Sequence, residues 1–128
     1  MKQVVERKDI TVEERNALLR FLKLELSFDG LLAELHGMVE IEFLPTKRIL
    51  TSHFNLVGPP IPVTKADVER AVNARKSEQV SEREIVRWAT MLAMNDAYVW
   101  EGPDEDEIVD ALNNLSIGGI ELYERGRA

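Results

Sequence analysis

The sequence predicts an α+β fold of about five helices packed with a two-stranded antiparallel β-hairpin. Apolar residues recur every three or four positions along most of the chain, which is the spacing of amphipathic helices. From residue 39 to residue 43 they recur at every second position, which is typical of a strand with one buried face, and residues 49–56 are rich in β-branched and aromatic residues. The length of 128 residues corresponds to a single domain, residues 1–128.

Two helices are predicted before the strands. Thr11 and Glu14 form a T-x-x-E capping box, in which each side chain satisfies a free backbone N–H of the other residue. The apolar stripe of this helix consists of Ala17, Leu18, Phe21 and Leu22. Ser27 is the expected cap of a second helix that extends to Gly37, although Asp29-Gly30 is also a hairpin turn signal.

The predicted hairpin follows these helices. In its first strand Glu40 and Glu42 alternate with the apolar residues Val39, Ile41 and Phe43. Pro45-Thr46-Lys47 is expected to turn the chain, and residues 49–56 return as the antiparallel partner. Because an isolated hairpin is only marginally stable in water, we expect it to lie against helices.

Three prolines in Gly58-Pro59-Pro60-Ile61-Pro62 interrupt the pattern. Proline donates no backbone hydrogen bond and holds φ fixed, so we expect neither a helix nor a strand ladder here. Residues 58–62 are therefore predicted to be a linker. It separates the N-terminal helices and hairpin, residues 11–57, from a C-terminal helical part, residues 63–119.

Three helices are predicted in the C-terminal part, and each begins with a capping pair: Thr64 with Asp67, Ser81 with Glu84, and Asp104 with Glu107. The middle helix has the clearest apolar stripe, so Trp88 is expected in the core. Gly118-Gly119 is expected to end the last helix. Residues 120–128 then form either a short strand or a frayed end.

The two parts each contain a similar short sequence pattern. Leu26-Ser27 and Val80-Ser81 each follow an amphipathic helix and precede an apolar pair at the same spacing. Two explanations are open: an inherited duplication, or the general likeness of one helix–turn–helix unit to another.

The composition excludes several classes of function. A formal net charge of −7 disfavours a nucleic-acid partner, because affinity for phosphate comes largely from lysine and arginine. A helix-turn-helix DNA reader over residues 68–92 would have its basic residues interleaved with acidic ones. The absence of cysteine removes disulfides, thiolate nucleophiles and cysteine-ligated metals, and it fits a reducing compartment. Phosphate-binding glycine motifs are absent, and we expect no cofactor.

Nothing in the sequence indicates export or a membrane. Charged residues throughout residues 1–10 interrupt the apolar stretch that a secretory signal requires. No apolar run approaches the roughly 18 residues that cross a bilayer. We therefore expect a cytoplasmic protein without a membrane partner.

The densest chemical feature is a run of carboxylates, here called the acidic segment: Glu101, Asp104, Glu105, Asp106, Glu107 and Asp110. Carboxylates stabilise the partly positive start of a helix, and Asp104 is the expected cap. These roles account for only part of the run. The surplus favours a docking surface for a cationic protein, with Trp100 as an aromatic anchor, and the alternative is a solvated helix start.

A small metal- or carboxylate-dependent enzyme is the rival class. His36, His53, Glu40 and Glu42 would surround a pocket at the hairpin in that case, but no H-E-x-x-H or comparable pattern accompanies them. His36 is expected instead to cap the end of the second helix. No serine lies in G-x-S-x-G, so we predict no catalytic residue and no metal site.

The C-terminal part resembles a group of small acidic bacterial proteins. The resemblance lies in Val63-Thr64-Lys65-Ala66-Asp67-Val68-Glu69-Arg70-Ala71, Val80-Ser81-x-x-Glu84-Ile85-x-x-Trp88-Ala89 and Asp106-Glu107-x-x-x-Asp110-Ala111-Leu112. Some of these proteins are similar to immunity proteins of polymorphic toxin systems. The resemblance covers residues 63–117. It implies an intracellular protein without catalysis that neutralises another protein, often a basic nuclease, through an acidic surface.

The leading hypothesis is a non-enzymatic protein-interaction module that binds a cationic protein through the acidic segment and Trp100. The small enzyme is the first alternative. The second is a structural, homo-oligomeric subunit, for example a homodimer in which the outer strand of the hairpin pairs with a second copy.

Overall fold

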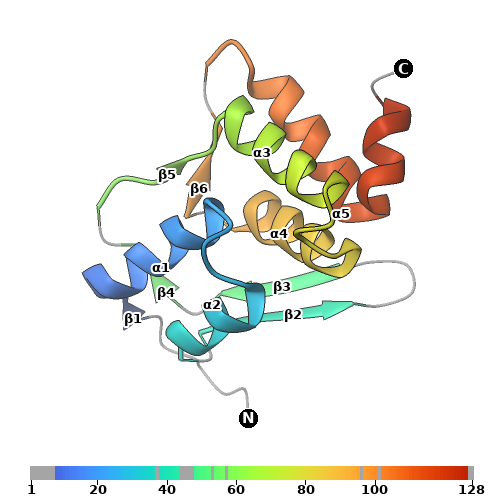
Figure 1. Cartoon of the computed structure of the whole chain (residues 1–128). Helices are drawn as coiled ribbons and strands as arrows, with labels where there is room; N and C mark the ends of the chain where they lie inside the picture. The colour runs from blue at the N-terminus through green and yellow to red at the C-terminus, as the bar shows by residue number, and fades with distance from the viewer. Residues whose placement is uncertain are drawn as a thin grey trace.

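The structure, a computed structural model, describes residues 8–36, 38–43, 48–52, 54–56, 58–95, 97–100 and 102–126. Within these residues the chain forms five helices and six short strands (Figure 1). The helices are α1 (Val12–Leu22), α2 (Phe28–Glu34), α3 (Lys65–Lys76), α4 (Glu82–Met94) and α5 (Glu105–Gly126). The strands are β1 (Lys8–Asp9), β2 (Val39–Phe43), β3 (Arg48–Ser52), β4 (Phe54–Asn55), β5 (Ile61–Pro62) and β6 (Tyr98–Val99). The predicted α+β class is confirmed, and the chain is mostly helical.

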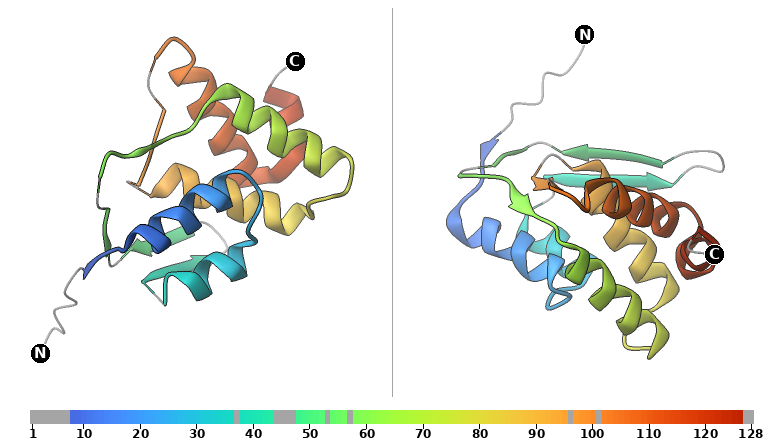
Figure 2. Two further views of the ribbon diagram at one scale, coloured as in Figure 1. Left: turned by 60° about the vertical axis from the view of Figure 1, so that its left-hand side comes forward. Right: turned by 90° about the horizontal axis from the view of Figure 1, so that it is seen from above.

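Helix α4 lies at the centre of the molecule and contacts each of the other helices (Figure 1). Its inward stripe is almost completely buried and consists of Ile85, Trp88, Ala89, Met91 and Leu92. The right-hand view of Figure 2, in which the molecule is seen from above, shows the hairpin β2–β3 as a layer along one side of the helices. The expected burial of Trp88 is confirmed, since only 1% of this residue is exposed.

The hairpin is antiparallel as predicted, and its register runs from Val39 opposite Ser52 to Phe43 opposite Arg48. Its second strand is shorter than predicted, because the chain leaves the hairpin after Ser52. Phe54–Asn55 instead forms β4, which pairs in parallel with β1. Phe54 is buried, so the change of partner places this aromatic ring in the core. The predicted turn at residues 45–47 lies outside the described residues.

The proline-rich stretch was wrongly expected to be free of strand pairing. Ile61–Pro62 forms β5, which pairs in parallel with β6. The N–H of Ile61 donates to the carbonyl of Ala97 at 2.7 Å, and the N–H of Val63 donates to Val99 at 2.7 Å. Only alternate residues of a strand donate to one neighbour, so the proline between these two donors costs the ladder no hydrogen bond.

The predicted helix starts are confirmed by their hydrogen bonds. Thr11 and Thr64 each form a complete capping box, with Glu14 and Asp67 respectively. Ser27 and Ser81 cap α2 and α4. Two side chains do not cap as predicted: Asp104, whose carboxylate is described below, and Glu84. The carboxylate of Glu84 accepts a hydrogen bond from the N–H of Phe28 at 3.2 Å and so joins α4 to the start of α2.

Helix α5 consists of two helical segments separated at Gly119, whose φ of +67° and ψ of −152° are not helical. The predicted stop at Gly118-Gly119 is therefore correct for the first segment. The expectation for the tail is wrong, since residues 120–126 are helical rather than a strand or a frayed end. Glu82 of α4 explains this. Its carboxylate accepts a hydrogen bond from the N–H of Ile120 at 3.1 Å and caps the second segment.

The two parts of the chain repeat one arrangement of backbone contacts. In each, a short strand leads into a threonine-capped helix, a turn with a left-handed residue (Leu24 or Glu78), and a serine-capped helix. The first strand then pairs in parallel with a strand that follows the second helix, β1 with β4 and β5 with β6. The likeness between the two parts therefore extends beyond a helix–turn–helix unit, and the hairpin β2–β3 lies between α2 and β4 of the first part.

Candidate functional site

The structure places the described carboxylates of the acidic segment at the start of α5, and all five side chains are exposed: Asp104, Glu105, Asp106, Glu107 and Asp110. Glu101 lies outside the described residues. Asp104 occupies the cap position, because its carbonyl accepts the N–H of Ile108 at 2.9 Å. Among the described residues, however, its carboxylate accepts no backbone hydrogen bond, so the expected capping box with Glu107 does not form.

Glu107 turns instead toward helix α3, where its carboxylate lies 3.2 Å from the Lys65 ammonium. This is the one ion pair that the acidic segment makes within the described part of the chain. The hydrogen bond and the charge of Glu107 raise the pKa of Lys65, and the charges of Asp104 and Glu69 add to this effect. The start of α5 is therefore a surface of negative potential on which one lysine offsets one carboxylate.

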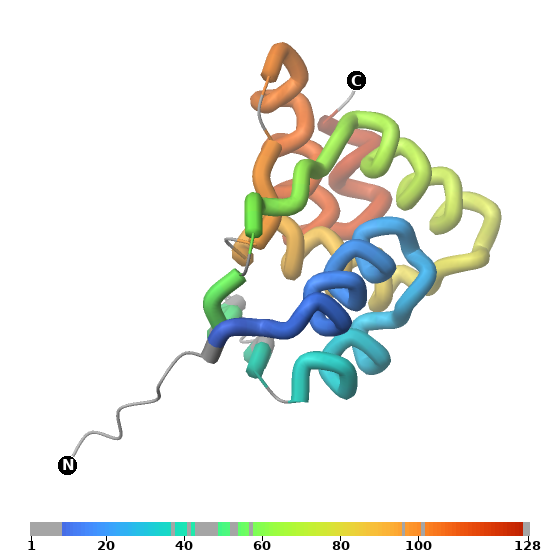
Figure 3. The backbone as a smooth tube through the Cα atoms, turned by 90° about the vertical axis from the view of Figure 1, so that its left-hand side faces the viewer, coloured from blue at the N-terminus to red at the C-terminus, as the bar shows by residue number. Residues whose placement is uncertain are grey.

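A pocket of about 280 Å³, here called the α3–α5 pocket, lies beside this surface. Its apolar lining consists of Val68, Ile108, Ala111 and Tyr123, and its polar lining of Lys65, Glu69, Glu107, Asp110 and Asn114. The walls come from α3 and from both segments of α5. Figure 3 shows the second segment turning back beside the first. The ion pair between Lys76 and Glu124, at 2.6 Å, ties this second segment to α3.

Of the residues that line the pocket, only Glu107 and Asp110 are among the predicted site residues. Lys65 and Glu69 belong to another helix, and Tyr123 lies beyond a break that was expected to end the helix. Glu107, Asp110 and Asn114 share one face of α5 at three- and four-residue spacing, which is the one local signal of this lining.

The predicted aromatic anchor is only half-buried. Trp100 packs against the hydrophobic core, keeps part of its surface accessible and precedes α5 by five residues in the sequence. Tyr98, its neighbour on β6, is buried and donates a hydrogen bond from its hydroxyl to the carbonyl of Leu18 at 2.8 Å. Burial raises the pKa of Tyr98 far above its usual value. Of the two aromatic residues, only Trp100 is therefore available to a partner.

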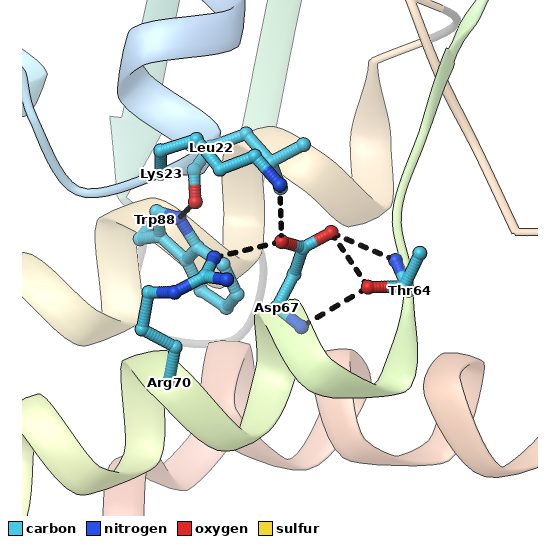
Figure 4. Close-up of polar contacts among 6 residues, drawn as sticks. All are labelled: Leu22, Lys23, Thr64, Asp67, Arg70 and Trp88. Atoms are coloured by element: carbon cyan, nitrogen blue, oxygen red, sulfur yellow. Dashed lines mark hydrogen bonds and ion pairs between the residues drawn. The ribbon is translucent and has the colours of Figure 1, made fainter.

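A buried carboxylate that the sequence predicted only as a helix cap is Asp67, with 1% of its side chain exposed (Figure 4). Lys23 and Arg70 each donate to its Oδ1 at 2.8 Å. The backbone and the hydroxyl of Thr64 each donate to Oδ2 at 2.9 Å. Burial alone would raise the pKa of Asp67, but the bonds from Lys23, Thr64 and Arg70 outweigh it and lower the pKa. Since both oxygens are occupied, we interpret this group as structural.

Replacing Asp67 with asparagine is expected to lower the free energy of unfolding at pH 7 by about 1–3 kcal/mol. A carboxylate whose pKa is lowered by folding stabilises the protein above its unfolded pKa, near 3.8, and stops doing so as the pH falls through the folded value. The difference between wild type and variant should therefore shrink below about pH 4. Urea titrations between pH 2 and 7 measure it.

Asp29→Asn is the matched control, because the Asp29 side chain is 82% exposed and lies 3.5 Å from Arg87. An exposed pair of this kind is worth about 0–1 kcal/mol, so the control should change little. If Asp67→Asn costs no more than Asp29→Asn at pH 7, the cluster around Asp67 does not support α3.

The structure brings together only part of the predicted enzyme alternative: Glu40 and Glu42 border one groove, which His36 does not line. Glu40 and Glu42 are exposed on β2 and border a groove of about 460 Å³ that also includes Leu32 and Ile49. His36 follows the end of α2 in a left-handed conformation, with φ of +51°, and is exposed. Its predicted place at the end of α2 is confirmed. His53 lies outside the described residues.

The basic residues of the helix-turn-helix alternative are mostly engaged by acids. Arg70 pairs with Asp67, Arg75 with Glu82, Lys76 with Glu124 and Arg87 with Asp29. Cations that already contact carboxylates contribute little to phosphate binding, because binding would have to break these pairs. Four basic side chains of this region therefore have acidic partners within the chain.

Comparisons with family models, curated proteins and solved structures find no match for this chain. Among the described residues, no helix combines the length and the apolar character needed to cross a membrane. In the same part of the chain, no group of three or more histidine, aspartate or glutamate side chains is arranged to hold a metal ion.

Proposed function

We propose that this chain is a non-enzymatic, cytoplasmic protein-interaction module of the immunity type, which binds and neutralises a cationic protein. Its contact surface is the start of α5, with the half-buried Trp100 at the edge. The observation that carries the proposal is the exposure of five carboxylates there, of which Glu107 alone has an ion-pair partner among the described residues. Helix capping does not explain this excess, since Asp104 makes no capping bond with its side chain.

Exposed carboxylates in this number suit association with a basic surface. They raise the rate of encounter through long-range attraction, and like charges repel acidic competitors. Trp100 adds apolar area beside the charges, which is the combination found at the energetically important centres of interfaces. The proposal therefore predicts fast association that weakens with ionic strength.

Neutralising Asp104, Asp106 and Asp110 together, as Asp→Asn, is expected to weaken partner binding at least about tenfold at low salt. The partner is isolated from extracts on the immobilised wild-type chain, identified by mass spectrometry, purified and titrated by calorimetry. Its formal net charge is expected to be positive. Affinity should also fall as ionic strength rises from about 0.05 to 0.3 M, where screening shortens the reach of exposed charges.

The matched control is Glu13→Gln, Glu34→Gln and Glu40→Gln in one chain, because these three carboxylates are exposed elsewhere and the change in net charge is the same. It should alter the affinity less than about twofold. A partner that binds both triple variants equally well, or that carries net negative charge, contradicts the proposal.

A further inference from the structure

We propose that the α3–α5 pocket holds the side chain of one arginine of the cationic partner, an inference that rests on the proposed function. The pocket opens beside the acidic segment, and two of that segment's carboxylates, Glu107 and Asp110, belong to its lining. The acidic segment, which is proposed to attract a basic protein, therefore adjoins the α3–α5 pocket, which is proposed to bind one basic side chain of that protein.

The size of the pocket fits a side chain rather than a larger ligand. Its volume of about 280 Å³ lies just below the range of about 300–1,000 Å³ that is typical of ligand pockets. Val68, Ile108 and Tyr123 are each at least nine-tenths buried and provide apolar walls, and the half-buried Ala111 lies between them. A chain of methylene groups gains free energy against such walls, whereas a compact, strongly hydrated ion does not.

The charge of the lining favours a cation. Glu69, Glu107 and Asp110 contribute three carboxylates against the single ammonium of Lys65. Lys65 is already paired with Glu107, so Glu69 and Asp110 face the pocket without an ion-pair partner among the described residues. A bound anion would meet an excess of negative charge. A metal ion would need convergent oxygen ligands, which the described carboxylates do not provide.

Arginine fits this lining better than lysine. Its planar guanidinium has five N–H donors and contacts carboxylates on two sides at once, whereas an ammonium acts as a point charge. Glu69 lines the pocket from α3 and Asp110 lines it from α5, and Asn114 adds an amide oxygen as a further acceptor. The guanidinium is also less strongly hydrated than an ammonium, so entering a partly apolar pocket costs it less.

The probe for this inference is N-acetyl-arginine amide, titrated into the ¹⁵N-labelled chain and followed by NMR. Saturable shifts are expected at the amides of Val68, Ile108, Ala111 and Asn114. N-acetyl-citrulline amide, which has nearly the same shape without the charge, should bind at least about tenfold more weakly. N-acetyl-lysine amide should also bind more weakly than the arginine compound.

Two matched variants separate the pocket from the general negative field. Asp110→Asn removes a carboxylate that lines the pocket, whereas Asp106→Asn removes an exposed carboxylate from the same helical turn that does not line it. The first should weaken the arginine probe about fivefold to tenfold, and the second less than about twofold. Ala111→Leu should fill the pocket and abolish the shifts. If that variant does not fold, the two asparagine variants decide.

Several results would overturn the inference: equal weakening by Asp110→Asn and Asp106→Asn, equal binding of the arginine and citrulline compounds, or tighter binding of spermidine than of the arginine probe. The last result would indicate a site for a small polyamine.

The pocket inference and the proposed function can also be contradicted separately. If the partner's affinity depends on the acidic segment but the arginine probe does not bind, the pocket inference fails alone. If the probe binds the pocket while the Asp104, Asp106 and Asp110 neutralisation leaves partner binding intact, the proposed function fails.

Discussion

Replacing Gly119 with alanine is expected to lower the free energy of unfolding by about 2–4 kcal/mol. Gly119 separates the two segments of α5 in a conformation, φ +67° and ψ −152°, that is essentially restricted to glycine. A Cβ at this position would lie 1.5 Å from the Glu82 carboxylate oxygen that caps Ile120. The substitution therefore adds backbone strain and also displaces the cap. Urea denaturation monitored by far-ultraviolet circular dichroism measures the loss.

Two further variants separate the two contributions. Gly102 also has a positive φ, +106°, but a Cβ there would have no neighbour within 4 Å, so Gly102→Ala reports backbone strain alone. In a Glu82→Ala background the oxygen that would collide is absent, and Gly119→Ala should then cost about as much as Gly102→Ala, roughly 1–2 kcal/mol. If Gly119→Ala costs the same with and without Glu82, contact with this carboxylate does not hold the break in α5.

Helix starts were predictable from the sequence because their hydrogen bonds are local. Thr11 with Glu14, and Ser81 with the N–H of Glu84, are three residues apart, so the pattern of residue types carries the whole interaction. The second segment of α5 was not predictable in this way. Its cap is a carboxylate on α4, and nothing near Ile120 in the sequence shows that such a group is present.

The same distinction explains the strands. The hairpin is recognisable because β2 alternates over five residues and β3 is rich in β-branched residues, whereas β1, β4, β5 and β6 are two residues each. Alternation between apolar and polar residues cannot be recognised in a strand of two residues. These short strands form because the flanking helices place their backbones side by side. The prediction of no strand at residues 58–62 is wrong because Pro62 lacks only its own backbone N–H, and the parallel pair of β5 and β6 does not use that donor.

The candidate site was predictable in part. The run of carboxylates was visible in the sequence, and the exposure of its five described members fits the cost of burying unpaired carboxylates. The pocket did not follow from the sequence, because its lining combines Glu69 of α3, Asp110 of the first segment of α5 and Tyr123 of the second. The break at Gly119 brings the last of these back toward α3. Gly119, the predicted end of the helix, is thus the break after which the second segment of α5 supplies Tyr123 to the pocket.

Replacing Trp88 with alanine is expected to cost about 3–5 kcal/mol, a large part of the stability of a domain of this size. Trp88 is 1% exposed at the centre of α4, so truncation removes the largest fully buried side chain and leaves a cavity. Its indole N–H donates to the carbonyl of Leu22 at 3.3 Å (Figure 4). Leu22 ends α1, where carbonyls have no partner within their own helix, so this bond satisfies an otherwise unpaired acceptor.

Trp88→Phe separates volume from hydrogen bonding, because it keeps most of the ring and removes the donor. It should cost about 1–3 kcal/mol, the penalty for leaving one buried acceptor unpaired together with a smaller cavity.

Trp100→Ala is the control for residue type and should cost less than Trp88→Ala, since Trp100 is only half-buried at the edge of the core. Because the variants alter the two tryptophans, unfolding is followed by far-ultraviolet circular dichroism rather than fluorescence. A loss for Trp88→Ala no larger than that for Trp100→Ala would mean that α4 is not the element on which the other helices depend.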